Sequence, residues 1–205
     1  MKEFNTIEKQ ETSELIEKKS KFIANIFHIN NIQEAEEKIE QIRKKYHDAR
    51  HNCYAYRVLE NESIIDRSSD DGEPSGTAGA PMLNILKKEK LCNILVIVTR
   101  YFGGILLGTG GLVRAYSQST QDVIEKSNVI LKQEGYVAII ELEYKELEKL
   151  KYFCKKKGIK IIDITYLENV SVKLEFKKEE KEIFANKEKL RFDYLNYTIM
   201  QEKFI

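Results

Sequence analysis

The chain has 205 residues, of which 42% are hydrophobic and 33% charged, and its formal net charge is +1. This length suits one large domain or two domains of about 100 residues each, and the composition excludes disordered, collagen-like and low-complexity chains. The longest apolar runs, residues 94–98 and 105–107, are far shorter than the roughly 20 residues of a membrane-spanning helix. The polar first residues contain no apolar signal core, so we expect a cytoplasmic protein.

The first part of the chain is expected to mix strands and helices. Apolar side chains recur at helical spacing over residues 32–46, whereas residues 94–98 are apolar on every position, which is typical of a strand buried on both faces. The expected strands are 21–26, 52–59, 63–67 and 92–101. The expected helices are 32–46, 77–88 and 111–127.

Beyond residues 131–135 the chain becomes rich in Lys and Glu, which indicates a second domain. The expected strands here are 136–144, 159–166, 170–176 and 195–204, and the expected helices are 145–157 and 178–190. This strand–helix–strand–strand–helix–strand order predicts a ferredoxin-like βαββαβ domain with helices on one face of an antiparallel sheet. We therefore predict an α+β protein with domains at 1–132 and 133–205.

A glycine-rich loop between a buried strand and a helix is the first candidate site. Eight of the ten glycines lie between Gly72 and Gly111, and free N–H groups at such a helix start favour an anion. The spacing fits neither a Walker A loop nor a GxGxxG motif, and a tight, glycine-dependent connection is the alternative. The candidate phosphate- or nucleic-acid-binding residues are Arg100, Tyr101, Gly103, Gly104, Gly108, Thr109, Gly110, Gly111 and Arg114.

An acidic loop forms the second candidate site, with four carboxylates between Asp66 and Glu73. Carboxylates beside a substrate phosphate could hold Mg²⁺, but the EF-hand spacing is absent, and Asp, Ser and Thr are also ordinary turn and cap residues. We favour a loop that contacts a partner or ligand and predict no metal site. Its candidate residues are His51, Asp70, Asp71, Gly72, Glu73, Pro74, Ser75, Gly76 and Thr77.

Neither the cysteines nor the histidines predict catalysis or a cofactor. Cys53, Cys92 and Cys154 lie far apart without a CxxC pair, so they are expected to be reduced and mostly buried thiols. His51 and Cys53 share one face of an expected strand, but side chains two apart on a strand rarely meet as a nucleophile and its base. The run 155–157 of three lysines is expected to be a solvated helix end.

Three segments together resemble the YigZ/IMPACT family: HNCYAY at 51–56, SDDGEPSGTAGAP at 69–81, and VTRYFGG at 98–104 with LGTGGLVRAY at 107–116. The resemblance implies a first domain similar to the second domain of ribosomal protein S5, with helices on one side of a sheet. It implies a second domain similar to an elongation factor module. It also implies a role in translation regulation.

These observations favour a non-enzymatic binding protein that acts on RNA, the ribosome or a translation factor, with no sequence-specific reading of DNA and no membrane partner. Exposed Arg100, Arg114, Lys155 and Lys156 would contact phosphate, and Tyr101 and Phe102 lie where bases could stack.

Two alternatives remain open at this stage. One is a Mg²⁺-dependent enzyme acting on a phosphorylated small molecule or nucleotide, with Asp70, Asp71 or Glu73 on the metal, Arg100 and Arg114 on phosphate, and His51 as acid or base. The other is a protein adaptor with no phosphate role.

Overall fold

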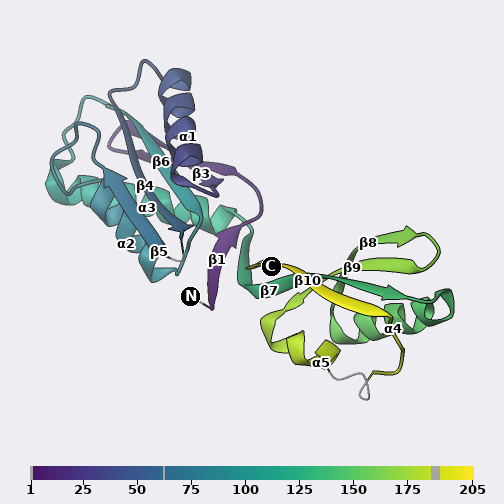
Figure 1. Cartoon of the computed structure of the whole chain (residues 1–205). Coiled ribbons are helices and arrows are strands. Elements are labelled where there is room, and N and C mark those ends of the chain that lie inside the picture. The colour runs from purple at the N-terminus through teal and green to yellow at the C-terminus, as the bar shows by residue number, and fades with distance from the viewer. Residues whose placement is uncertain (1, 62, 186–189) are drawn as a thin grey trace. The chain divides into compact units, whose positions relative to one another are not determined.

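The computed structural model describes residues 2–61, 63–185 and 190–205. It divides into two compact units, essentially Glu3–Leu131 and Lys132–Ile205 (Figure 1). Both units combine strands with helices, so the α+β class expected from the sequence is confirmed. Among the described residues, no helix has both the length and the apolar character needed to cross a membrane.

The first unit is built on a five-stranded antiparallel sheet with the order β2-β3-β6-β4-β5. Its strands are β2 (Glu11–Glu17), β3 (Ser20–His28), β4 (His51–Glu60), β5 (Ser63–Ser69) and β6 (Ile94–Tyr101). A short strand, β1 (Glu3–Ile7), precedes them. The sequence analysis missed β1 and β2, because the β2–β3 turn is made by Lys18 and Lys19 at positive φ instead of the Asn-Gly that marks such turns.

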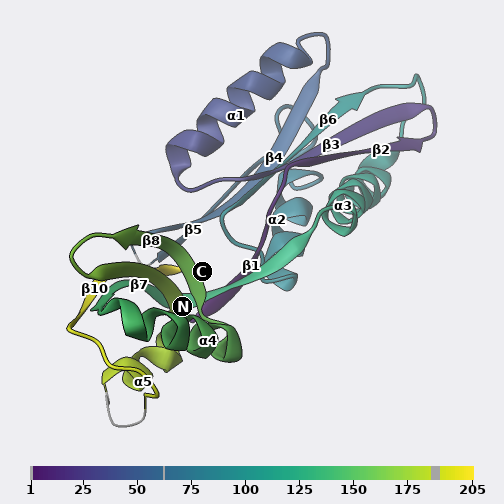
Figure 2. The same ribbon diagram turned by 90° about the vertical axis from the view of Figure 1, so that its right-hand side faces the viewer.

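Helices cover both faces of this sheet, as Figure 2 shows. Helix α1 (Ile32–Lys45) lies on one face, and α2 (Gly79–Lys88) and α3 (Gly108–Lys126) lie on the other. Leu95 and Ile97 of β6 belong to the core under α1, whereas Val96 and Val98 belong to the core under α2 and α3. The expectation of helices on one side only is therefore wrong, and two-sided burial explains why residues 94–98 of this strand are all apolar.

The helix ends reflect local chemistry. The side chain of Asn31 accepts a 2.8 Å hydrogen bond from the N–H of Glu34 and so caps α1. Helix α2 begins two residues later than expected. Helix α3 begins at Gly108, three residues earlier than expected, because its first turn contains glycines that carry no apolar periodicity.

The described residues of the second unit form four strands, two helices and two short 3₁₀ turns. They are β7 (Val129–Leu142), η1 (Tyr144–Glu146), α4 (Leu147–Lys157), β8 (Lys160–Tyr166), β9 (Val170–Lys177), η2 (Lys178–Glu180), α5 (Lys181–Ala185) and β10 (Asn196–Phe204). Strand β7 pairs with β9 and β10, and β9 pairs with β8, all antiparallel.

One face of this second sheet carries the core of the unit. Val172 and Leu174 of β9 pack with Leu150 and Cys154 of α4, and Gly158 at φ 72° ends that helix. Of the expected helix 178–190, the structure forms η2 and α5 over residues 178–185 and Leu190 is not helical, whereas residues 186–189 lie outside the described part of the chain.

Candidate functional site

The strand register brings the motif segments of the first unit to one end of its sheet. Arg100, near the end of β6, pairs with His51 at the start of β4, and Tyr101 pairs with Lys21 at the start of β3. The turn 18–19, the segment 46–50, the loop 70–78 and the loop 102–107 therefore meet there. We call this region the loop end.

A buried ion pair joins the acidic loop to the end of β6. The Nη1 of Arg100 donates to Oε1 of Glu73 at 2.7 Å, and the two residues are only 6% and 8% exposed. The hydroxyl of Tyr116 on α3 donates to the same carboxylate at 2.9 Å. The expectation that Arg100 is exposed is wrong: its charge neutralises Glu73 inside the unit, so it positions the loop end instead of standing free for a ligand.

Cys53 and His51 on β4 hold the acidic loop from the other side. The thiol of Cys53 lies 2.9 Å from the carbonyl oxygen of Asp70 and 3.3 Å from the hydroxyl of Tyr116. Burial raises the pKa of this thiol to about 12, so the thiolate is scarce at neutral pH. The Nδ1 of His51 lies 2.9 Å from the carbonyl oxygen of Asp71.

The carboxylate of Asp70 is bonded entirely within the loop. It accepts hydrogen bonds of 2.8–2.9 Å from the N–H groups of Gly76, Ala78 and Gly79 at the start of α2. Burial opposes ionisation of Asp70, but these three donors outweigh it and lower the pKa of the carboxyl. Asp70 therefore holds the start of α2. Gly79 is the first residue of that helix, and a Cβ on it would collide with the backbone of Ser69.

The carboxylate of Asp71 also has donors from inside the first unit, but they lie outside the loop. It accepts hydrogen bonds from Arg43 Nη2 of α1 at 2.9 Å and from the N–H of Asn52 at 2.7 Å. The carboxylates that a Mg²⁺-dependent enzyme would use thus already have internal donors. Across residues 2–61, 63–185 and 190–205 no three His, Cys, Asp or Glu side chains gather closely enough to hold a metal ion.

The remaining loop residues make turns. Thr77 donates through its hydroxyl to the carbonyl oxygen of Pro74 at 2.6 Å, Gly72 and Gly76 have φ of 86° and 77°, and Ser75 is exposed. The sequence analysis missed Tyr116 as a polar member of this cluster. The sequence did contain a clue, because a tyrosine on the buried face of a helix needs a hydrogen-bond partner for its hydroxyl.

The glycine loop itself faces solvent. Phe102 and Leu106 are 47% and 83% exposed, and Gly104 and Gly108 take φ of 84° and 73° with open space around them. Gly103 lies so close to the backbone of Lys19 that a Cβ would not fit. The loop is therefore anchored at Gly103 and open beyond it.

Cations border this loop. Arg114 is exposed on the second turn of α3, and its Nη1 lies 3.6 Å from where a Cβ on Gly110 would stand. Lys18 and Arg114 both line a groove of about 410 Å³ between β2 and the first half of α3. Among the described residues, no side chain makes a capping hydrogen bond at the start of α3.

Tyr101 lies beside the loop but has a partner. Its hydroxyl donates to Asp48 at 2.7 Å, and this hydrogen bond raises the pKa of Tyr101 to about 12 and lowers that of Asp48. Phe102 is consequently the aromatic ring of the loop that keeps a free face, with the guanidinium of Arg100 5.6 Å from its centroid.

The comparisons with known proteins agree along most of the chain. The family described as Impact N-terminal domain matches residues 18–124, and the family described as Domain of unknown function (DUF1949) matches residues 140–187. IMPACT family member YvyE of Bacillus subtilis is 37% identical over 180 residues, which cover 88% of this chain and 82% of that protein. IMPACT family member YigZ of Escherichia coli is 37% identical over 150 residues, covering 73% and 74% of the two chains.

A solved structure extends this likeness to both units. The crystal structure of an hypothetical protein is 30% identical, has a TM-score of 0.63 and covers 95% of this chain and 97% of its own. The motif segments that meet at the loop end all lie within the part that matches the Impact N-terminal domain. By this match and by the extent of its relatives, the chain belongs to the IMPACT family.

Proposed function

We propose that this chain is a non-enzymatic, translation-associated protein that binds RNA through the loop end of its first unit. The observation that carries the proposal is an imbalance of free charge. Asp71 and Glu73 are paired with Arg43 and Arg100, and Asp70 is held by three backbone N–H groups. Lys18 and Arg114 stand exposed in the groove beside the start of α3, where the described lining sets one carboxylate, Glu17, against these two cations. The surface left for a ligand attracts anions.

The helix start and the two cations of this surface suit a phosphate. The first N–H groups of a helix have no partner within the helix, and the helix dipole adds partial positive charge at that end. Arg114 can reach an anion over Gly110, where the absence of a side chain leaves room. Guanidinium groups bind phosphate oxygens in a bidentate way.

Phe102 supplies the second half of the recognition. Sequence-specific and general contacts to single-stranded RNA combine phosphate binding with stacking of unpaired bases on aromatic rings. The ring of Phe102 is half exposed beside the glycine loop, and Arg100 supports it from the buried side. Because the whole chain carries a net charge of only +1, binding depends on this local surface.

The link to translation comes from membership in the IMPACT family and from the finer fold assignment, which we also propose. The second unit follows the βαββαβ order, and its strands lie as β10-β7-β9-β8, which supports a ferredoxin-like module of the elongation factor kind. The first unit is proposed to be ribosomal-protein-S5-domain-2-like, with α1 added on its second face. The ribosome, or RNA on it, is the proposed partner.

Co-sedimentation of the full chain with ribosomes across a salt series tests the proposal. We expect binding that falls steeply with salt, and the Arg114→Ala variant should bind roughly tenfold more weakly with a salt slope lower by about 0.7. Arg67→Ala removes another exposed arginine from β5, outside the loop end, and should bind as the wild type does.

Two results would contradict the proposal. Binding that resists salt would point to a protein surface as partner, and equal binding by the Arg114→Ala and Arg67→Ala variants would remove the loop end from the interface.

A further inference from the structure

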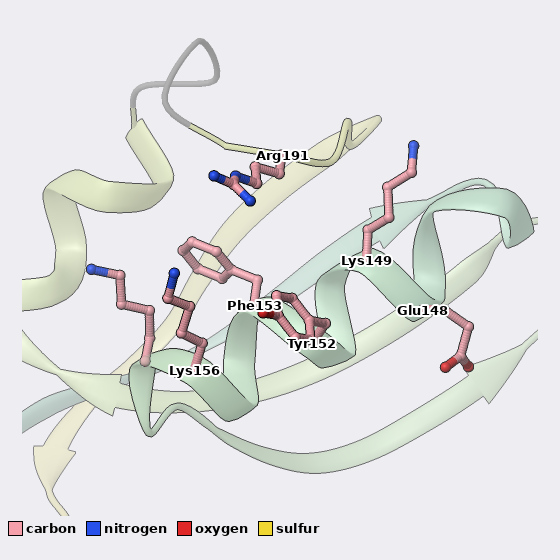
Figure 3. A pocket seen from close by; sticks show the side chains of 7 residues that line it. Glu148, Lys149, Tyr152, Phe153, Lys156 and Arg191 are labelled. Carbon is pink, nitrogen blue, oxygen red and sulfur yellow. The ribbon is translucent and has the colours of Figure 1, made fainter.

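The second unit has a groove of about 620 Å³ along the exposed side of α4, closed on one side by Arg191 (Figure 3). Neither the motifs nor the proposed function accounts for it. Its volume falls in the range of small-molecule sites, about 300–1,000 Å³. The lining combines two aromatic rings, Tyr152 and Phe153, with several cations.

The two rings differ in how they are held. Phe153 packs edge-to-face against Phe184 and Phe192, with centroids 6.0 and 5.4 Å away, so it belongs to the core of the unit. Tyr152 is 63% exposed, and its hydroxyl has no hydrogen bond among the contacts of the described residues. Tyr152 therefore offers an exposed aromatic face, next to the fixed ring of Phe153, on which a planar group can stack.

The cations of the groove are free in the part of the chain that the structure describes. Lys156, Lys157 and Arg191 are exposed and make no ion pair there. Figure 3 shows Lys156 and Arg191 reaching toward the same side of Phe153, while Glu148 points away from it. Glu148 is paired with Lys151 at 2.8 Å, so the groove's own acid does not neutralise these cations.

The run of three lysines at the end of α4 is thereby divided. The sequence analysis assigned residues 155–157 to a solvated helix end, which favours cations through the helix dipole. In the structure Lys156 and Lys157 line the groove and Lys155 does not. Lys155 and Lys156 are both exposed and carry the same charge, but only Lys156 lines the groove.

We propose that this groove binds a nucleotide, with its base stacked on Tyr152 and its phosphate between Lys156 and Arg191. The nucleotide is either free or part of a single-stranded RNA, since both present the same base and phosphate. Cations alone would fit any anion, but an exposed ring next to them fits a ligand that has both a negative charge and a planar face. The inference concerns the second unit and does not depend on the loop end.

Titrations of the full chain test this inference. The probes are uridine monophosphate, adenosine monophosphate and a fluorescein-labelled single-stranded hexauridylate. The variants are Lys156→Ala and Tyr152→Ala, each with a matched control: Lys155→Ala makes the same charge change outside the groove, and Tyr152→Phe keeps the ring. We expect Lys156→Ala and Tyr152→Ala to raise Kd at least about fivefold, and both controls to stay within about twofold.

The outcomes separate the sources of the nucleotide. Mononucleotide binding that is as tight as hexauridylate binding supports a free nucleotide, whereas binding of hexauridylate alone supports RNA. Equal effects of Lys155→Ala and Lys156→Ala would overturn the inference, as would the absence of binding by any probe. The ligand would instead be an acidic protein segment if an Asp/Glu-rich peptide displaced hexauridylate completely and bound the Tyr152→Ala variant as tightly as the wild type.

The same titrations keep this inference apart from the proposed function. If Arg114→Ala weakens hexauridylate binding while the α4 variants do not, the loop end stands and the groove fails. If only the α4 variants weaken it, the groove stands and the loop end fails.

Discussion

The buried pair of Arg100 and Glu73 offers the sharpest test of how the loop end is built. Replacing Glu73 with Gln leaves the guanidinium almost fully buried without a counter-charge. Its Nε already has no partner in the described structure, and Nη2 has only a long 3.4 Å contact with Ser20. Removing one member of a buried ion pair costs about 3–5 kcal/mol. Because the Gln carbonyl can still accept a hydrogen bond, we expect a loss of about 3 kcal/mol in the free energy of unfolding of the first unit.

The double variant Glu73→Gln/Arg100→Met checks the reasoning behind that number. It removes the unpaired charge together with its partner and places an apolar chain between the rings of Phe22 and Phe102. We expect it to be at least as stable as Glu73→Gln alone, with a coupling energy of about 2 kcal/mol or more.

Cysteine accessibility provides the assay. All three cysteines are buried, with Cys53 and Cys92 in the first unit and Cys154 in the second. Pulse alkylation across a urea series, read by peptide mass spectrometry, therefore reports the unfolding of each unit separately. The reasoning is refuted if Glu73→Gln lowers the unfolding free energy of the first unit, measured by alkylation of Cys92, by less than about 1 kcal/mol. It is also refuted if the loss of unfolding free energy in the double variant equals the sum of the losses in the two single variants.

Three more predictions use the same region. Gly103→Ala should disrupt the first unit or displace the glycine loop, because a Cβ there would collide with the backbone of Lys19. Gly104→Ala should cost only about 1 kcal/mol, because Gly104 has positive φ but open space around it. Equal urea midpoints of the two variants would contradict this. The pKa of Asp70 is lowered in the folded chain, so its ionised form stabilises the first unit above about pH 4 and loses that contribution as pH falls through the lowered pKa. The urea-midpoint gap between wild type and Asp70→Asn should therefore narrow from pH 6 to pH 3, and a constant gap would be the opposite result. With its pKa raised to about 12 by burial, Cys53 should resist iodoacetamide at pH 8 until urea unfolds the unit, and rapid labelling of the native chain would show that the thiol is accessible.

Periodicity revealed the elements whose side chains are sorted by burial. Helix α1 and strands β4, β6 and β9 follow from their apolar patterns, because one face or both faces of each are buried. Strand β2 alternates only between half-buried and exposed positions, and its turn has no glycine, so nothing local marks it. The first turn of α3 was missed for a similar reason, because its glycines have no side chains that could form an apolar pattern.

The candidate site was located by motif but not understood from it. Residue types and spacing singled out the acidic and glycine-rich segments, and in the structure the acidic loop contacts the end of β6 through Glu73 and Arg100. Which side chains face each other could not be read, because Glu73 and Arg100 are 27 residues apart and their contact depends on a sheet register that no short segment determines. Arg100, which the sequence presents as available for a ligand, is therefore a structural partner. Arg114, the other arginine that the sequence singled out, is exposed, as is Lys18, which the sequence analysis did not name.

The strand order of the first unit also constrains how the chain folds as it is made. Strand β6 lies between β3 and β4, and its pairs with β3 join residues from 66 positions apart, at His28 and Ile94, to 80 positions apart, at Lys21 and Tyr101. During synthesis β3 and β4 emerge first and have no contact with each other in the sheet until β6 arrives. At roughly 5–20 residues per second, both strands spend seconds with unpaired edges. The nascent chain therefore has its most aggregation-prone period before residue 101 leaves the ribosome, and a pause there would prolong exposure of the unpaired edges of β3 and β4.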